Sequence, residues 1–292
     1  MKKLAGFLSA AFLSLALVAC GQGEQPAEET KTAGETAPTE TVEATEEVVK
    51  LVIGASNVPH AEVLEAAAPL LLEEGIEIEV VRFQDYVLPN RALASEELDA
   101  NYFQHIPYLT AQNTDHGYGF VNAGGIHIEP IGVYSQKYAS LEELPEGAEI
   151  IMSSAIPDHG RILAMLQDKG LITLAEGVGI TATLEDIVEN PKNFKFNDRV
   201  EASLLPQAYL NGEGDAVLIN SNFALGAGLS PGQDAIALES SDVTNPYVNV
   251  IAVREGDENR PEIQKLVEVL QSETIRNFIL ENWGGDVVPA QK

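Results

Sequence analysis

The sequence predicts an α/β fold, because short segments suited to β-strands recur between segments with helical periodicity. Hydrophobic residues make up 45% and charged residues 21% of the 292-residue chain, which is ordinary globular usage and excludes a disordered or collagen-like protein. Strands that alternate with helices favour parallel pairing in a sheet whose two faces are covered. A chain of this length forms one or two domains.

The first three elements have the clearest patterns. Segment 51–54 is a short apolar run that ends at a glycine, as a buried strand does. Segment 61–74 is rich in helix formers, and its apolar residues recur at helical spacing. Segment 76–81 alternates isoleucine with glutamate before two valines, which indicates a strand with one buried face. Similar patterns predict strands at 131–134, 149–152, 216–220, 235–238 and 249–253, and helices at 90–97, 161–169 and 261–270.

Two α/β segments in one chain fit two lobes that flank a cleft, because open α/β sheets bind ligands at the carboxyl ends of their strands. We place the crossovers between the lobes near Gly132 and Asn245. The second lobe, 133–245, is then inserted in the first lobe, which comprises 51–132 and 246–292.

The chain is strongly acidic, with 45 Asp and Glu against 17 Lys and Arg and a formal net charge of −28. Such a charge repels the phosphates of nucleic acids, so we expect no nucleic-acid partner. Cys20 is the only cysteine, which excludes an intrachain disulfide and a cysteine-based metal cluster.

The N-terminal segment 1–19 is typical of a signal peptide, with two lysines before an apolar run that is too short to span a bilayer comfortably. The run ends in LVACG, which resembles the bacterial lipobox. We therefore expect lipidation of Cys20 and anchoring to the cell membrane on its extracytoplasmic side; a secretory signal with an incidental cysteine is the alternative. Segment 20–50 is rich in Glu, Thr, Ala and Pro and predicts a disordered acidic tether.

Six strings of residues occur in the order known from one protein family. They are FQDYVLPNRAL (83–93), LDANYFQHIPYL (98–109), HIEPIGVYS (127–135), DIVENPKN (186–193), INSNFA (219–224) and PYVN (246–249). From about 51 to 289 the chain resembles the methionine-binding lipoproteins of ABC importers. The resemblance implies a two-lobed, periplasmic-binding-protein-like fold of type 2, without a cofactor. It also implies delivery of methionine, or a closely related amino acid, to a membrane permease and its ATPase.

One segment departs from this family. The chain has SSAIPDHGR at 153–161, where the family usually has PNDPTNEGR. In the family this loop meets the polar end of the amino acid, so the change leaves the architecture intact and puts methionine itself in question. The alternatives are a D-amino acid, a methionine-containing dipeptide or another apolar amino acid, or a surface lipoprotein used in adhesion or sensing.

Arg161 is the candidate partner of a ligand carboxylate. A guanidinium offers two parallel charge-assisted hydrogen bonds, and Arg161 follows what looks like a helix start, where an anion is favoured. From the residues alone a surface salt bridge is the commoner role, and the resemblance implies ligand contact instead. We expect Arg161→Ala to remove most ligand affinity and to leave the melting of the empty protein almost unchanged. Asp158 could pair with an ammonium group or cap the helix.

Amide and aromatic side chains supply further candidates. Asn220 and Asn222 follow an apolar run where a strand ends, at the edge where clefts form, and local turn chemistry is the alternative. Asn245 lies at the second crossover. It could contact the ligand, or it could serve as a hinge residue alone. The aromatic residues available for the cleft wall, of which only some can face it, are Tyr86, Tyr102, Phe103, Tyr108, Tyr134 and Tyr247.

Two histidines complete the set. His105 and His127 are expected to hydrogen-bond the ligand or to fix the cleft wall. A metal pair with His60, Glu62 or Glu129 is the alternative, but the close spacing of a metal-binding motif is missing. The sequence also lacks a Gly-x-Ser-x-Gly string, a His-Glu-x-x-His string and a phosphate-binding glycine-rich loop. We therefore expect neither catalysis nor a metal.

Overall fold

A computed structural model describes residues 48–242 and 245–291. The signal peptide expected at 1–19, the lipidation of Cys20 and most of the expected tether lie outside the described residues. The described residues belong to one compact unit that starts at Glu46. Its first strand, β1 (Val49–Ser56), includes the last two residues of the expected tether, 49 and 50. Within the described ranges, no helix is both long enough and apolar enough to cross a bilayer.

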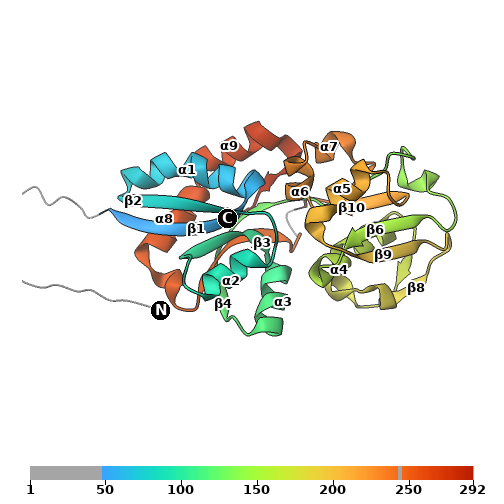
Figure 1. The fold of residues 1–292 in the computed structure, drawn as a ribbon, viewed down its shortest axis with the longest axis horizontal. Helices are drawn as coiled ribbons and strands as arrows, with labels where there is room; N and C mark the ends of the chain where they lie inside the picture. Colours follow the sequence, from blue (N-terminus) through green and yellow to red (C-terminus); the bar gives the residue numbers. More distant parts are fainter. Residues whose placement is uncertain (1–47, 243–244, 292) are drawn as a thin grey trace, which may run out of the picture. The chain divides into compact units, whose positions relative to one another are not determined.

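The chain forms two main sheets from different parts of the sequence (Figure 1). The first has the strand order β13-β4-β12-β3-β1-β2. Besides β1, its strands are β2 (Ile76–Phe83), β3 (Ala100–His105), β4 (Phe120–Ile128), β12 (Val248–Arg254) and β13 (Val288–Pro289). The helices and short helical turns of this lobe are η1 (Asn57–Ala61), α1 (Glu62–Glu73), α2 (Leu88–Ala94), α3 (Ile106–His116), η6 (Asp257–Asn259), α8 (Pro261–Leu270), α9 (Glu273–Trp283) and η7 (Gly284–Asp286).

Alternation along β1 supplies both faces of the first sheet. Leu51 and Ile53 pack into a core with α1, α8 and α9, whereas Val52 packs against the core that includes α2 and α3. Successive side chains of a strand point to opposite faces, so one strand serves two layers. Leu51 and Ile53 are fully buried, and burial of each such side chain stabilises the fold by about 1.5–3 kcal/mol.

The second sheet has the strand order β11-β5-β10-β6-β9. Its strands are β5 (Gly132–Tyr134), β6 (Glu149–Ser153), β9 (Lys195–Val200), β10 (Ala216–Ile219) and β11 (Ala237–Leu238), and β7 (Thr173–Leu174) and β8 (Ile187–Glu189) form a separate pair. The helices and helical turns of this lobe are η2 (Leu141–Glu143), α4 (Ile156–Asp168), η3 (Gly179–Thr181), η4 (Leu184–Asp186), η5 (Ala202–Leu204), α5 (Leu205–Leu210), α6 (Ser221–Gly226) and α7 (Pro231–Asp234). One face of this sheet packs with α4, and the other packs with α5 and α6.

The chain passes twice between the sheets, after β4 and before β12. Gly132, assigned from sequence to the end of the first lobe, is the first residue of β5 in the second sheet. The two sheets and the two passages between them give the protein the two-lobed α/β fold that the sequence predicts.

The expectation of parallel pairing is wrong for part of each sheet. β1 pairs in parallel with β2 and β3, but β12 is antiparallel to β3 and β4, and β5 is antiparallel to β10. The reason is the crossover: Asn249, near the start of β12, pairs with His105 at the end of β3 and with His127 near the end of β4. A strand that returns from the other lobe enters the sheet where its neighbours finish.

Candidate functional site

A small cavity lies between the two lobes. The first lobe contributes side chains from β3, α3 and β12, and the second lobe contributes side chains from α4 and the start of α6. The residues that line the cavity are Tyr86, Phe103, Gln104, His105, Tyr108, Glu129, Arg161, Asn220, Ser221, Asn222 and Asn249.

Arg161 is buried on α4, and most of its guanidinium is already paired. Nε donates to a carboxylate oxygen of Glu239 at 2.9 Å, and Nη2 donates to the same oxygen and, at 2.6 Å, to the backbone carbonyl of Glu129. Nη1 lies 3.8 Å from Asp158. Burial alone would lower the pKa of Arg161, but Glu239 and Asp158 raise it, so the side chain stays charged. Nη1 is therefore the edge left for a ligand carboxylate.

Asp158 joins the two lobes beside Arg161. His105 Nε2, from the first lobe, lies 3.0 Å from one carboxylate oxygen of Asp158, and Asn220 Nδ2 donates to the other oxygen at 3.0 Å. Burial would raise the pKa of Asp158, but these hydrogen bonds and Arg161 lower it, so the carboxylate is ionised. The side chain makes no capping bond to α4, so the helix-cap alternative for Asp158 is wrong.

Three aromatic rings form the apolar part of the cavity wall. The ring centres of Tyr86 and Phe103 are 6.0 Å apart, and those of Tyr86 and Tyr108 are 5.8 Å apart. The Tyr86 hydroxyl donates to Asn222 Oδ1 at 2.6 Å, which is a second hydrogen bond between the lobes. Aromatic faces of this kind pack well against an aliphatic or thioether side chain.

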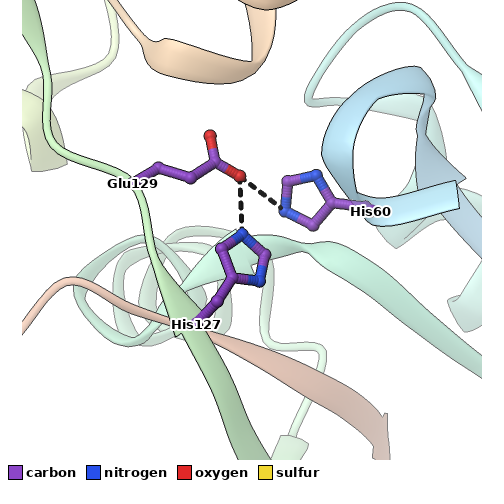
Figure 2. A group of neighbouring side chains, drawn as sticks. All are labelled: His60, His127 and Glu129. Atoms are coloured by element: carbon purple, nitrogen blue, oxygen red, sulfur yellow. Dashed lines mark hydrogen bonds and ion pairs between the residues drawn. The ribbon is translucent and has the colours of Figure 1, made fainter. Parts of the chain in front are cut away.

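Glu129 is the centre of a buried cluster, shown in Figure 2. One of its carboxylate oxygens lies 2.7 Å from His127 Nε2 and 3.3 Å from His60 Nε2, and the other accepts the backbone N–H of Asn222 at 2.9 Å. The Tyr102 hydroxyl hydrogen-bonds His127 Nδ1. Donor atoms of His60, His127 and Glu129 lie within 4.8 Å of one another, so these groups could hold a metal ion. Neutral imidazoles that donate through Nε2 satisfy the same carboxylate without one.

The cluster predicts acid sensitivity of the fold. Burial lowers the pKa of His127 to about 3 and that of His60 to about 4, against about 6.5 in an unfolded chain. The unfolded chain therefore binds protons that the folded chain does not, and stability falls as the pH decreases from about 6.5 toward 4. Each histidine lowers the free energy of unfolding by about 1.4 kcal/mol per pH unit in this window, and Glu129, whose pKa burial raises, offsets part of the loss.

Urea unfolding at pH 7 and pH 5.5 measures this effect. The native chain should lose about 1–2 kcal/mol more stability between these values than the double variant His60→Gln, His127→Gln. The comparison with the variant removes the contribution of carboxylates elsewhere. Equal losses in the two proteins would contradict neutral buried histidines.

The structure brings most of the predicted ligand contacts to one cavity. Seven of the candidates line it, and their contact with a ligand stays a prediction: Tyr86, Phe103, His105, Tyr108, Arg161, Asn220 and Asn222. Asp158 lies directly behind this wall, in contact with His105, Arg161 and Asn220.

Besides Asp158, three candidates do not line the cavity. Tyr134 is fully buried in the second lobe, 5.6 Å from the ring of Tyr209, because alternation on β5 turns it toward α5 and α6. His127 lies one layer behind the wall, against Glu129. Asn245 closes a local turn: its Oδ1 accepts the N–H of Tyr247 at 2.8 Å, and its Nδ2 donates to Glu239 at 3.2 Å.

Four lining residues were missed as ligand contacts. They are Gln104, Glu129, Ser221 and Asn249. Position gives the signal for two of them: Glu129 directly follows β4, and Asn249 pairs with His105 at the same end of the first sheet. Strand ends that meet at a crossover are where open α/β folds place ligand contacts.

Two α/β lobes around a cavity with aromatic, amide and charged walls define the class of two-lobed ligand-binding proteins. The family model described as NlpA lipoprotein matches residues 51–291. The chain belongs to the NlpA lipoprotein family. This confirms the resemblance found in the sequence.

The relatives are similar over most of the chain. The methionine-binding lipoprotein MetQ of Bacillus subtilis is 49% identical over 247 residues, which cover 83% of this chain and 89% of the relative. The D-methionine-binding lipoprotein MetQ of Salmonella typhimurium is 38% identical over 276 residues, covering 94% and 93%. The structure of a nutrient binding protein from Burkholderia cenocepacia bound to methionine matches with a TM-score of 0.77 and 42% identity, covering 82% of this chain and all of that one.

Proposed function

We propose that this protein is the substrate-binding component of an ABC importer and that it binds methionine in the cavity between its lobes. The observation that carries the proposal is the division of the cavity wall into an aromatic part and a charged part. The names of the relatives and the methionine bound in the Burkholderia cenocepacia structure support the same ligand.

The wall matches the chemistry of methionine. A buried carboxylate or ammonium group must find a partner, because an unpaired buried charge costs several kcal/mol. Arg161 Nη1 offers a charged donor for the carboxylate, and the amides of Asn222 and Asn249 offer neutral donors. The thioether then packs against Tyr86, Phe103 and Tyr108.

Transport gives the lobes their role. Two of the cross-lobe contacts, His105 to Asp158 and Tyr86 to Asn222, lie beside the cavity and belong to a closed arrangement. A ligand that touches both lobes stabilises this arrangement by its greater affinity for it, and opening releases the ligand to a membrane permease and its ATPase. Lipid chains on Cys20 hold the protein on the extracytoplasmic side of the membrane. No bond is made or broken, so the protein is not an enzyme.

The altered loop 153–161 is the reason to test the cargo directly. Within it, Asp158 is an ionised carboxylate close to Arg161, which changes the electrostatics at the polar end of the cavity.

Calorimetric titration of the purified protein with L-methionine, D-methionine, leucine, glutamate and methionylglycine tests the proposal. We expect L-methionine to bind most tightly and glutamate not to bind, because a second carboxylate would face the aromatic rings. At a free concentration of 100 times the dissociation constant, methionine should raise the free energy of unfolding by about 2.7 kcal/mol. Absence of both heat and stabilisation with methionine would contradict the proposal.

A further inference from the structure

The cavity contains a buried acceptor without a partner. Asn220 Nδ2 donates to Asp158, and because a carboxylate only accepts, this bond fixes the orientation of the amide. Asn220 Oδ1 is left with no hydrogen-bond partner among the described residues, although Asn220 is only 6% exposed. A bare buried carbonyl is unfavourable, so this atom is suited to receive an N–H group of a ligand.

Glu129 supplies a second acceptor in the same wall. Its first carboxylate oxygen is held by His127 and His60, and Figure 2 shows the second oxygen pointing away from both imidazoles. This second oxygen accepts the backbone N–H of Asn222. A carboxylate oxygen has two lone pairs, so it can accept one more hydrogen bond. Glu129 lines the cavity together with Asn220.

The buried charges around the cavity are predominantly negative. The carboxylates are Glu129, Asp158 and Glu239, and the guanidinium of Arg161 is the single permanent cation that the described residues place against them. His60 and His127 are neutral at pH 7, because burial lowers the pKa of each imidazole to about 4 and about 3. A positive group on the ligand therefore compensates the net negative charge of this site, whereas a negative group adds to it.

Arg161 is poorly placed to dominate recognition. Its Nε and Nη2 face Glu239 and the Glu129 carbonyl, so the two-pronged edge that normally grips a carboxylate is occupied within the protein. Only Nη1 remains for the ligand carboxylate, and it lies 3.8 Å from the competing carboxylate of Asp158.

We propose that Glu129 and Asn220 Oδ1 bind the α-ammonium group of the ligand, and that this group, rather than the carboxylate, supplies most of the polar recognition. The inference rests on the proposed function, in which the ligand is an amino acid. It extends the ligand class to amides and esters of apolar amino acids and excludes derivatives acylated on the amino group.

Titration of the purified protein with methionine, methionine amide and N-acetylmethionine at pH 6.5 tests the inference. At this pH an α-amino group is largely protonated. Methionine amide should bind within about tenfold of methionine, and N-acetylmethionine at least about 100-fold more weakly, because it leaves buried acceptors and a buried carboxylate unpaired. The opposite order, or equal binding of methionine and N-acetylmethionine, would overturn the inference. Failure of methionine itself to bind would instead overturn the proposed function, and the inference with it.

The variant Glu129→Gln separates ammonium binding from a purely structural role. We expect it to weaken methionine and methionine amide by at least about 30-fold and N-acetylmethionine by less than about threefold. A structural defect would weaken all three ligands by the same factor, and that outcome would overturn the role of Glu129. The control variant Glu268→Gln changes an exposed acid on α8 and should bind all three ligands like the native chain. If Glu129→Gln does not fold, the ligand series on the native chain still decides the inference.

Discussion

Replacement of Arg161 by alanine is expected to weaken methionine binding and also to lower the stability of the ligand-free protein by about 3–5 kcal/mol. The side chain is 3% exposed and pairs with Glu239, whose own side chain is 10% exposed, and with Asp158, which is 1% exposed. Removal of the guanidinium leaves two buried carboxylates without their cation. The sequence-based expectation of an unchanged melting profile is therefore wrong, because the sequence does not reveal that Glu239 lies against Arg161.

Denaturant unfolding of the ligand-free protein measures this effect, with Arg199→Ala as the matched control. Arg199 is exposed, and its replacement should change stability by less than about 0.5 kcal/mol. A second variant, Arg161→Ala with Glu239→Gln, should recover part of the lost stability, since it removes one of the stranded charges. Unchanged stability in Arg161→Ala would show that the pair with Glu239 does not form.

Gly160→Ala should destabilise the second lobe by about 3 kcal/mol or more and weaken ligand binding at the same time. A Cβ atom at position 160 would lie 2.1 Å from the backbone oxygen of Ile180. The obstacle is backbone of η3, which cannot rotate away as a side chain could, so α4 or η3 must move. Arg161 is the next residue on α4, and a shift of this helix displaces its guanidinium.

Gly226→Ala is the control for this substitution. Gly226 is the last residue of α6, and a Cβ there would meet no atom within 4 Å. Alanine should be neutral or stabilising at this position by up to about 1 kcal/mol, because it has the higher helix propensity. Thermal unfolding of the two variants should therefore move in different directions from the native midpoint. A Gly160→Ala protein as stable as the native chain would contradict the close approach of η3 to α4.

Local sequence patterns were sufficient for elements with a regular hydrophobic period. The strand expected at 76–81 is β2, and the helix expected at 261–270 has the same bounds as α8. β3 was missed because it shows neither alternation nor an apolar run: all its side chains are buried, including Asn101 and Gln104. These two amides are satisfied by each other and by Asn90 on α2, which is a contact between separate elements that no local period reports.

The residues of the candidate site were also predicted only in part. The aromatic wall and the two asparagines after β10 were predicted, because they fall within strings shared with the family or at a strand end. The partners that set the electrostatics were not predicted: Glu239 is 78 residues from Arg161, and Asp158 is 53 residues from His105. Such pairings follow from tertiary packing, within the second lobe for Arg161 and Glu239 and between the lobes for His105 and Asp158, which a single sequence does not specify. Tyr134 was expected in the cavity wall but lies in the core of the second lobe. A strand of three residues is too short for its sequence to indicate which side chains face the core.

A crystal structure of the protein with methionine tests the central claim most directly. We predict methionine between the lobes, with its thioether against Tyr86 and Phe103 and its carboxylate within hydrogen-bond distance of Arg161 Nη1. Methionine bound outside this cavity, or an Arg161 side chain turned into solvent while the ligand is held, would contradict it.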